Sequence, residues 1–290
     1  MIRLCAPAKV NLSLHVIQKR DDGYHDLITR MQKLKLCDWI ELRQTDDQQI
    51  TIICDDRKVP SDETNLAVQA ALSFYKTYDP DKKHGLAIEL EKNIPVAAGL
   101  GGGSSDGAAV LKGLNKLYNY PFSELELIDL ARPLGADLAF FVSKKSAVVA
   151  YGIGDRLAQA NIIDDYNYLL VNPCFSVSTK WVYDNYRLTK KTNKFTLCGS
   201  QNDEKKSFSA EELYNDLEQV TSVRYPVIDK VKKILLACGA AGSLMSGSGP
   251  TVFGLFDKKR DSEKAIKQIS KRLAEIGDFR IFSTCAYNGA

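Results

Sequence analysis

Residues 99–105, Gly-Leu-Gly-Gly-Gly-Ser-Ser, form the segment of this sequence best suited to bind an anion. Four of these residues are glycines, which let a backbone take unusual dihedral angles or lie close to a ligand. The two serines add hydroxyl groups and can cap the helix predicted for residues 106–117. Unpaired N–H groups and the positive end of the helix dipole would then face one point, where phosphate is the usual ligand.

Two familiar phosphate-binding motifs do not match this glycine loop. Gly102 and Gly107 have the glycine spacing of a Walker A loop, but Ala108 stands where that motif has lysine. The dinucleotide motif G-x-G-x-x-G fails as well, because Ser104 occupies the position of its third glycine. A simple turn or linker is the alternative, and the apolar helix that follows at once argues against it. The glycine loop is therefore a candidate phosphate site of a third class.

Lys9 and Asn11 belong to a segment in which polar and apolar residues alternate up to Val16. This period is typical of a half-buried strand, and it puts the two polar side chains on one face, roughly 7 Å apart. A hairpin turn is predicted at residues 21–23, Asp-Asp-Gly, and leads into Tyr24 and His25. From the local sequence alone, the Tyr24 and His25 side chains could equally be surface residues.

Asp137 is the only ionisable residue in the apolar run of residues 134–142. One interpretation is a helix N-cap. The other is a carboxylate with a chemical task, because a charge among leucine, alanine and phenylalanine needs a partner or a function. The local sequence leaves both open.

The composition restricts the class of protein. A chain of 290 residues is long enough for two domains, and its formal net charge of +3 is too small to favour a nucleic-acid partner. Seven scattered cysteines without a C-x-x-C pair, together with three histidines, indicate a reducing compartment and no structural zinc site. The N-terminus shows no signal peptide or long apolar segment, so we expect a cytoplasmic protein without a membrane partner.

Periodicity and capping signals predict an α+β chain. Helices are expected after a cap at Thr64 or Asn65, after the glycine loop, after a capping box that begins at Ser123, and at residues 227–237 and 262–276. Strands are expected at residues 2–4, 9–16, 39–42, 50–54, 86–90, 147–151, 168–171, 251–256 and 280–286, with Pro7 ending the first. The first domain is expected to cover residues 1–158 and the second residues 159–290.

Three segments together carry a family resemblance: residues 7–12 (Pro-Ala-Lys-Val-Asn-Leu), the glycine loop, and residues 246–249 (Ser-Gly-Ser-Gly). Their order resembles that of the GHMP kinases, small-molecule kinases with their own phosphate loop, over nearly the whole chain. The resemblance implies a two-domain α+β architecture. Its N-terminal part is a mixed α/β domain with a ribosomal-protein-like fold, and its C-terminal part is a ferredoxin-like α/β sandwich.

Within that family, residues 22–25 (Asp-Gly-Tyr-His) and 135–137 (Gly-Ala-Asp) resemble a particular group of members. That group phosphorylates the 2-hydroxyl of 4-diphosphocytidyl-2-C-methyl-D-erythritol, a step of the non-mevalonate route to isoprenoid precursors. The resemblance implies ATP as the phosphoryl donor, Mg²⁺ delivered with the nucleotide, and a small-molecule substrate that carries a CDP group. The sequence identifies no metal-ligating residue, and it does not show whether a protein side chain binds Mg²⁺. We expect a monomer or weak homodimer.

The resemblance also implies roles for individual residues. Asp137 matches the catalytic base, and Lys9 matches the lysine beside it. Tyr24 is implied to stack on the cytosine and His25 to hydrogen-bond it. The implied substrate-binding residues are Asn11, Tyr24, His25, Thr179 and Tyr183, with Tyr183 as the second aromatic on the cytosine. The implied ATP site consists of Asn65, Lys92, Pro95, Val96, Ala97, Ala98, Gly99, Leu100, Gly101, Gly102, Gly103, Ser104 and Ser105.

The sequence departs from the family pattern at two places. Ala97 and Ala98 stand where members often have a longer glycine run, and Met31 stands where an aromatic residue often occurs. Two alternative functions stay open. One is another GHMP kinase with a mevalonate-, homoserine- or sugar-type substrate, which leaves the cytosine-binding aromatics unexplained. The other is a non-catalytic nucleotide-binding regulator of the same fold, which leaves the lysine–aspartate pair unexplained.

Overall fold

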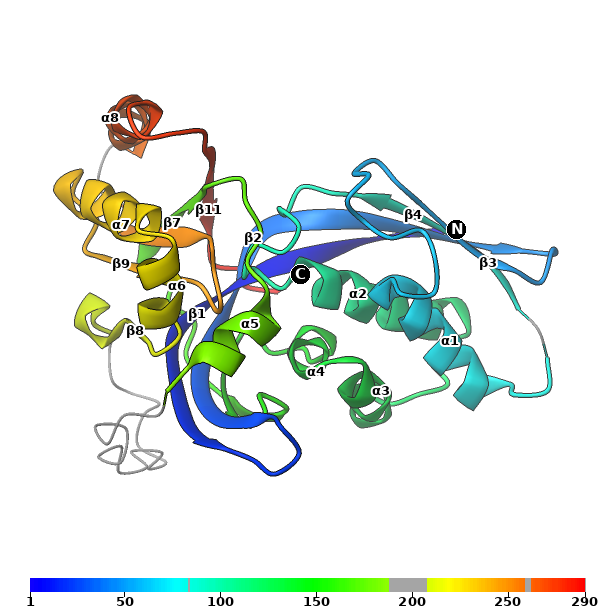
Figure 1. Ribbon diagram of the computed structural model, residues 1–290. Helices are drawn as coiled ribbons and strands as arrows, with labels where there is room; N and C mark the ends of the chain where they lie inside the picture. Colours follow the sequence, from blue (N-terminus) through cyan, green and yellow to red (C-terminus); the bar gives the residue numbers. More distant parts are fainter. Residues whose placement is uncertain (83, 188–207, 259–261, 290) are drawn as a thin grey trace. The chain divides into compact units, whose positions relative to one another are not determined.

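The computed structural model describes residues 1–82, 84–187, 208–258 and 262–289, and it has the expected α+β content (Figure 1). The chain forms two compact units. The first consists of Met1–Ala8, Leu36–Val96 and Gly101–Lys145, and the second of Lys9–Lys35, Ala97–Leu100 and Ser146–Ala290. These units are discontinuous along the chain, unlike the expected division at residue 158, so that division stays a prediction.

Two long strands, β1 (Ile2–Lys19) and β2 (His25–Thr45), contribute residues to both units. The prediction that Pro7 ends the first strand is wrong, because β1 continues through it. Proline has a φ compatible with a strand and removes a single N–H donor, so a long strand tolerates one. The predicted Asp-Asp-Gly turn does join β1 to β2, and Gly23 N donates to the Arg20 carbonyl there at 3.1 Å.

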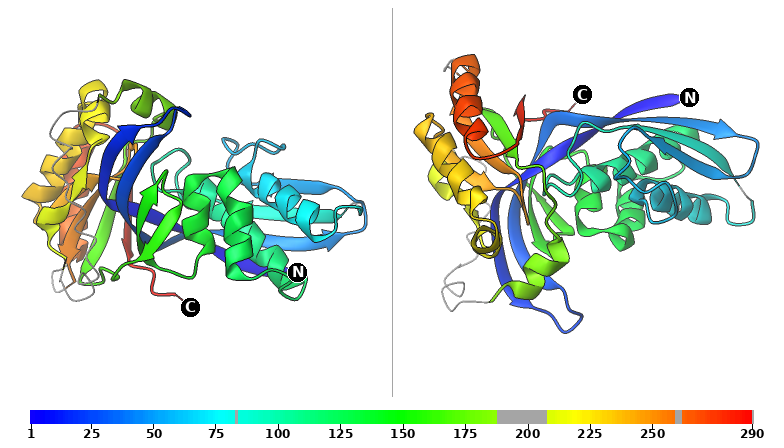
Figure 2. Two further views of the ribbon diagram at one scale, coloured as in Figure 1. Left: turned by 90° about the horizontal axis from the view of Figure 1, so that it is seen from below. Right: turned by 45° about the horizontal axis from the view of Figure 1, so that its top comes forward.

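The first unit combines strands with helices. Its elements, besides parts of β1 and β2, are β3 (Ile50–Cys54), α1 (Leu66–Tyr78), β4 (Gly85–Glu91), α2 (Gly102–Leu117), α3 (Glu124–Ala131), the single-turn helix η1 (Arg132–Leu134) and α4 (Ala136–Val142). Strand β4 runs parallel to β3 and antiparallel to β2. The helices lie on one face of these strands (Figures 1 and 2).

Local signals in the sequence explain where helices of this unit begin. Asn65 caps α1 by accepting from Ala67 N at 2.9 Å. Ser123 and Glu126 form the expected capping box of α3, in which each side chain accepts from the backbone N–H of the other residue. Helix α2 packs against both α1 and α4, so these three helices form one compact layer.

The second unit holds the remaining elements. They are β5 (Ala147–Gly152), β6 (Arg156–Gln159), β7 (Tyr166–Asn172), α5 (Thr179–Asn185), the single-turn helix η4 (Ala210–Glu212), β8 (Tyr214–Asn215), α6 (Glu218–Arg224), α7 (Val227–Ala237), β9 (Gly242–Met245), β10 (Val252–Asp257), α8 (Ser262–Ala274) and β11 (Arg280–Cys285). Strand β5 pairs antiparallel with β2 and with β6, and β8 pairs parallel with β1.

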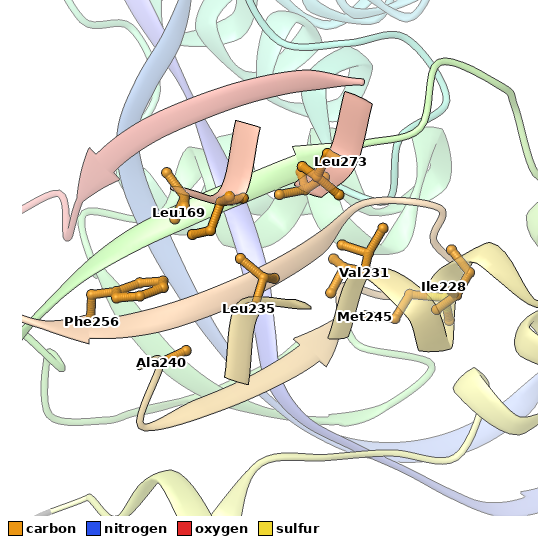
Figure 3. Close-up of a cluster of buried hydrophobic side chains, with 11 residues drawn as sticks. Leu169, Ile228, Val231, Leu235, Ala240, Met245, Phe256 and Leu273 are labelled. Atoms are coloured by element: carbon orange, nitrogen blue, oxygen red, sulfur yellow. The ribbon is translucent and has the colours of Figure 1, made fainter. Parts of the chain in front are cut away.

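Strands β11, β7, β10 and β9 form an antiparallel four-stranded sheet in that order. Helices α7 and α8 cover one face of it, as the expected ferredoxin-like sandwich requires (Figure 2). Apolar residues of both helices and of the sheet form the buried core between them (Figure 3). This core includes Leu169, Ile228, Val231, Leu235, Met245, Phe256 and Leu273. Among the described residues, no helix is both long and apolar enough to span a membrane.

Candidate active site

The Lys9 side chain is buried on β1 and is held by a chain of hydrogen bonds. Its ammonium donates to Asn11 Oδ1 at 2.6 Å, and only 4% of the residue is exposed. Asn11 Nδ2 donates to Thr29 Oγ1 at 2.8 Å, and that hydroxyl donates to the Ser13 carbonyl at 2.7 Å. Lys9 and Asn11 thus share a face as predicted, but both are buried where a half-exposed strand is expected. A buried ammonium needs such partners, because an isolated charge is costly there.

Residues 246–249, here called the serine loop, pack directly on this pair. Asn11 N donates to Ser246 Oγ at 3.4 Å. A Cβ on Gly247 would lie 3.3 Å from Asn11 Oδ1 and 3.6 Å from Lys9 Nζ, and the φ of this glycine is +56°. Both the turn and the close approach therefore require a residue without a side chain.

The first half of the glycine loop belongs to the same unit. Ser246 Oγ donates to the Gly99 carbonyl at 2.9 Å, and Lys9 N donates to the Leu100 carbonyl at 2.9 Å. Gly99 has a φ of +77°, and a Cβ there would overlap the carbonyl oxygen of Ser246. The three sequence segments that carry the family resemblance are thus joined by direct hydrogen bonds within the second unit.

The second half of the glycine loop starts helix α2 in the first unit. Gly101 is the N-cap with a φ of +72°, and no side chain caps the helix. The prediction that Ser104 or Ser105 is the N-cap is wrong, because a glycine at positive φ lets the helix begin earlier. The N–H groups in the first turn of this 16-residue helix lack intrahelical acceptors and lie at its positive end. The expected phosphate site depends on this arrangement.

A charged cluster of Asp38, Lys92 and Asp106 is buried beside that first turn. Lys92 Nζ donates to Asp38 Oδ2 and, at 2.8 Å, to Asp106 Oδ2, and none of the three side chains is more than 4% exposed. Asp38 Oδ1 accepts from Asn93 N at 2.6 Å and from Ile94 N at 2.8 Å. The cluster therefore ties the end of β4, the strand β2 and helix α2 together.

Two carboxylates share one ammonium in this cluster, and they differ in their surroundings. Burial, with the Asp38 charge, raises the pKa of Asp106 to about 7 despite the neighbouring Lys92. Burial lowers the pKa of Lys92, but the Asp106 and Asp38 carboxylates bring that pKa above its ordinary value. Asp106 Oδ1 has no hydrogen-bond partner within the described part of the chain, whereas Asp38 Oδ1 has two backbone donors. Of the two carboxylates, Asp106 is therefore the one that takes up a proton as the pH falls towards 7.

Asp137 is the second residue of α4 and is half-buried. The N-cap of this helix is Gly135, so the alternative in which Asp137 caps it is wrong. A Cβ on Gly107 of α2 would lie 3.2 Å from Leu138 Cδ2, which shows how closely the two helices approach. The helix that carries Asp137 is therefore fixed against the helix that follows the glycine loop.

The implied cytosine-binding residues lie in the second unit. Tyr24 is 63% exposed at the turn between β1 and β2. The His25 ring stacks on the Tyr183 ring with a centroid distance of 5.1 Å. Burial lowers the pKa of His25, and the Lys19 charge lowers it further against the opposing Asp184 carboxylate. Thr179 Oγ1 lies 2.8 Å from Ser248 Oγ, which connects α5, the helix of Tyr183, to the serine loop.

Comparison with known proteins identifies the family. Residues 65–145 match the GHMP kinases N terminal domain, and residues 204–275 match the GHMP kinases C terminal domain. The chain is 45% identical over 273 residues to 4-diphosphocytidyl-2-C-methyl-D-erythritol kinase of Desulfotalea psychrophila. The aligned region covers 94% of this chain and 91% of that protein. The chain belongs to the GHMP kinase family.

Solved structures of GHMP kinases share the fold. A crystal structure of 4-(cytidine 5'-diphospho)-2C-methyl-D-erythritol kinase superposes with a TM-score of 0.75 at 30% identity, over 98% of this chain and 99% of that one. Homoserine kinase from Cytophaga hutchinsonii has a TM-score of 0.72 at 20% identity, over 98% of this chain and 94% of that one. The second comparison shows the GHMP kinase fold alone.

Two residues that the GHMP kinase resemblance puts near the adenine have structural partners in this chain. Asn65 Oδ1 caps α1, and its Nδ2 donates to the Pro60 carbonyl at 2.7 Å. The Lys92 ammonium lies within the charged cluster. Their direct contact with ATP stays a prediction.

The structure shows the conformation and surroundings of the three residues that depart from the GHMP kinase pattern. Ala97 is exposed with a φ of +53°, a left-handed conformation that glycine adopts more readily. The Ala98 carbonyl accepts from Thr251 N at 3.3 Å. Met31 is 1% exposed on β2, opposite Val148 of β5, and is a core residue.

Sequence reasoning missed Asp38 and Asp106 of the charged cluster, and also Asn215, which donates to the carbonyls of Met245 and Gly247 at the serine loop. Asp38 is the one charged residue in the apolar run of residues 36–40, and Asp106 directly follows the two serines of the glycine loop. Both signals resemble that of Asp137 and could have been found. Asn215 carries no such signal, because it lies in a polar stretch far along the chain from the segments it contacts.

Proposed function

We propose that this GHMP kinase transfers the γ-phosphoryl group of ATP to the 2-hydroxyl of 4-diphosphocytidyl-2-C-methyl-D-erythritol, a step of the non-mevalonate route to isoprenoid precursors. The observation that carries the proposal is the hydrogen-bonded network of Lys9, Asn11, Gly99 and the serine loop. The 45% identity to the Desulfotalea psychrophila enzyme supports this substrate. We further propose a cytoplasmic monomer or weak homodimer.

Phosphoryl transfer requires mainly positioning and charge stabilisation from the protein. Asp137 accepts the proton of the 2-hydroxyl as its oxygen forms a bond to the γ-phosphorus. The bond between that phosphorus and the β–γ bridging oxygen breaks, and ADP leaves. The Lys9 ammonium offsets the negative charge of the transferring group, and Asn11 keeps that ammonium in place.

The ATP phosphates are assigned to the glycine loop and to the first turn of α2, where backbone N–H groups and the helix dipole favour anions. A Mg²⁺ ion bound with the nucleotide would neutralise phosphate charge. Ser105 fits a role as an oxygen ligand there. It is 1% exposed, and its hydroxyl has no hydrogen-bond partner within the described residues.

The role of Asp137 is tested by Asp137→Asn. Loss of the general base should lower kcat by about 100- to 10,000-fold, while ATP affinity stays within roughly threefold of the parent protein. Steady-state kinetics and nucleotide titration measure both quantities. Asp129→Asn is the matched control, since that carboxylate is exposed on α3 and pairs only on the surface with Arg132. A kcat for Asp137→Asn within a few-fold of the control would reject Asp137 as the base.

The role of Tyr24 is tested by Tyr24→Ala. Because base stacking on an aromatic ring contributes about 1–3 kcal/mol, the KM for the CDP-bearing substrate should rise by roughly 5- to 150-fold. Tyr120→Ala is the matched control, because Tyr120 is 65% exposed and Tyr24 is 63% exposed. An equal KM in the two variants would remove Tyr24 from the cytosine site.

One assay separates the proposed function from its two alternatives. ATP consumption is measured with 4-diphosphocytidyl-2-C-methyl-D-erythritol, with the same alcohol lacking the CDP group, and with mevalonate, homoserine and sugar alcohols. Turnover that needs the CDP group supports the proposal. Turnover of a substrate without it identifies a different GHMP kinase, and ATP binding without any turnover identifies a regulator.

A further inference from the structure

Asn215 makes three hydrogen bonds with its buried side chain. It lies on β8, opposite Leu14 of β1, and is 7% exposed. Its Nδ2 donates to the Met245 carbonyl at 2.8 Å and to the Gly247 carbonyl at 2.7 Å. Its Oδ1 accepts from Leu217 N at 3.0 Å. A planar amide that is bonded on both ends is fixed in orientation, so it defines where the two carbonyls lie.

The two carbonyls that Asn215 holds frame the start of the serine loop, whose other side meets the Lys9–Asn11 pair. Gly247 approaches Asn11 Oδ1 and Lys9 Nζ closely enough that a Cβ would fall 3.3 Å and 3.6 Å from these atoms. Ser246 Oγ accepts from Asn11 N. A shift of the Gly247 backbone would therefore displace the ammonium and its amide partner directly.

Other neutral groups hold the rest of the serine loop. Thr221 Oγ1 of α6 donates to the Ser248 carbonyl at 3.2 Å, and Ser246 N donates to the Thr251 carbonyl at 2.9 Å. Asn215 differs from these in bonding two carbonyls at once. Its removal would leave two buried carbonyls and one buried N–H without their partner, and such groups cost free energy until the backbone moves to satisfy them.

We propose that Asn215 is a positioning residue for phosphoryl transfer. It holds the serine loop against Lys9 and Asn11 and thereby fixes the Lys9 ammonium where the transferring phosphoryl group needs it. The inference rests on the proposed function for its catalytic consequence, but the holding of the loop does not depend on that function. A displacement of about 1 Å in a catalytic group can lower the rate by about 100-fold, so the effect is measurable.

The test compares Asn215→Ala with Asn115→Ala. Asn115 is a matched control, because it is 5% exposed and its side chain also bonds backbone groups on both ends, the Phe122 carbonyl and Phe122 N, near the end of α2. Both variants should lose thermal stability. Asn215→Ala alone should lower kcat by about 10- to 100-fold, with the KM for ATP within roughly threefold of the parent protein. A kcat within about twofold of that of Asn115→Ala would overturn the proposal.

Amide hydrogen exchange of residues 245–251 gives a readout that needs no turnover. It should become faster in Asn215→Ala and stay unchanged in Asn115→Ala, and equal exchange in the two variants would overturn the holding role.

If Asn215→Ala does not fold, Thr221→Val replaces it, because this isosteric change removes one bond to the loop. A kcat reduced by about threefold or more supports the proposal, and a smaller reduction overturns it. A parent protein that consumes no ATP with any alcohol would instead refute the proposed function, and exchange would still decide the role of Asn215.

Discussion

The charged cluster of the first unit and the serine loop of the second unit both fix a backbone turn, but with different kinds of group. In the charged cluster, one ammonium and two carboxylates join β2, β4 and α2. The serine loop is held by the Asn215 amide, by threonine and serine hydroxyls and by backbone groups. One turn thus depends on buried charge and the other on the shape of a neutral network.

This difference has consequences for stability. Burying an ion pair gains little net free energy, but removing one partner leaves an uncompensated charge that is very costly. Removing one hydrogen bond from a neutral network costs less free energy of unfolding. Such a network nevertheless tolerates no added side-chain volume where the backbone itself makes the contact. The charged cluster should therefore respond most to charge removal and to pH, and the serine loop most to added atoms.

The largest effect is expected for Asp38→Ala. This change leaves Lys92 with one carboxylate and strips two backbone N–H groups of their acceptor. Loss of one partner from a buried ion pair costs about 3–5 kcal/mol in the free energy of unfolding. Chemical denaturation of the variant and the parent protein measures it. Asp129→Ala, at an exposed carboxylate of the same unit, should change stability by less than about 1 kcal/mol. A similar small cost at Asp38 would show that the cluster is solvated after all.

A somewhat smaller effect is expected for Gly99→Ala. The added Cβ meets the Ser246 carbonyl oxygen, and alanine at a φ of +77° is strained as well. Strain of about 1–2 kcal/mol and overpacking of about 1–3 kcal/mol together predict a loss of roughly 2–5 kcal/mol. Gly23→Ala is the matched control, since Gly23 has a φ of +87° and no atom within 4 Å of a Cβ. The difference between the two variants isolates the contact with the serine loop. If both lose the same stability, the glycine loop is not packed on the serine loop.

The same comparison shows how far the sequence could predict the structure. Periodicity and caps predicted most strands and the starts of α1 and α3, because these signals are local. The glycine loop and the Lys9–Asn11 face were also readable. The bonds from Asn215 to residues 245 and 247, and the approach of Gly247 to Asn11, join segments far apart in the chain. No local pattern encodes such contacts, so only the fold reveals them.

The pH response of the charged cluster is tested by Asp106→Asn. The pKa of Asp106 is about 7 in the folded protein, compared with an ordinary value of 3.8. Between pH 3.8 and pH 7 the folded protein therefore binds a proton at Asp106 that the unfolded chain does not. Stability contributed by this group therefore falls as pH rises from about 4 to 7, because folding then requires a proton that is increasingly scarce. The variant lacks this term. From about pH 5 to pH 8 it should gain on the order of 1–3 kcal/mol relative to the parent protein.

Denaturation of both proteins across that pH range measures this gain. Asn215→Ala serves as the comparison from the neutral network, and its stability difference from the parent protein should be nearly constant with pH. A constant difference for Asp106→Asn as well would mean that Asp106 stays ionised in the folded protein throughout the range. The cluster would then hold a full net negative charge, and the distinction from the serine loop in pH response would disappear.

The smallest effect is expected for Ala97→Gly, two residues before the glycine loop, in the second unit. Ala97 is exposed, and its φ of +53° costs an alanine about 1–2 kcal/mol that a glycine avoids. Glycine in turn loses about 0.5–1 kcal/mol more backbone entropy on folding. The balance predicts a variant that is more stable by roughly 0.5 kcal/mol, measured as a shift in the denaturation midpoint at constant slope. A loss of stability would mean that the Ala97 methyl group packs against the protein. The segment before the glycine loop would then depend on close packing, as the serine loop does.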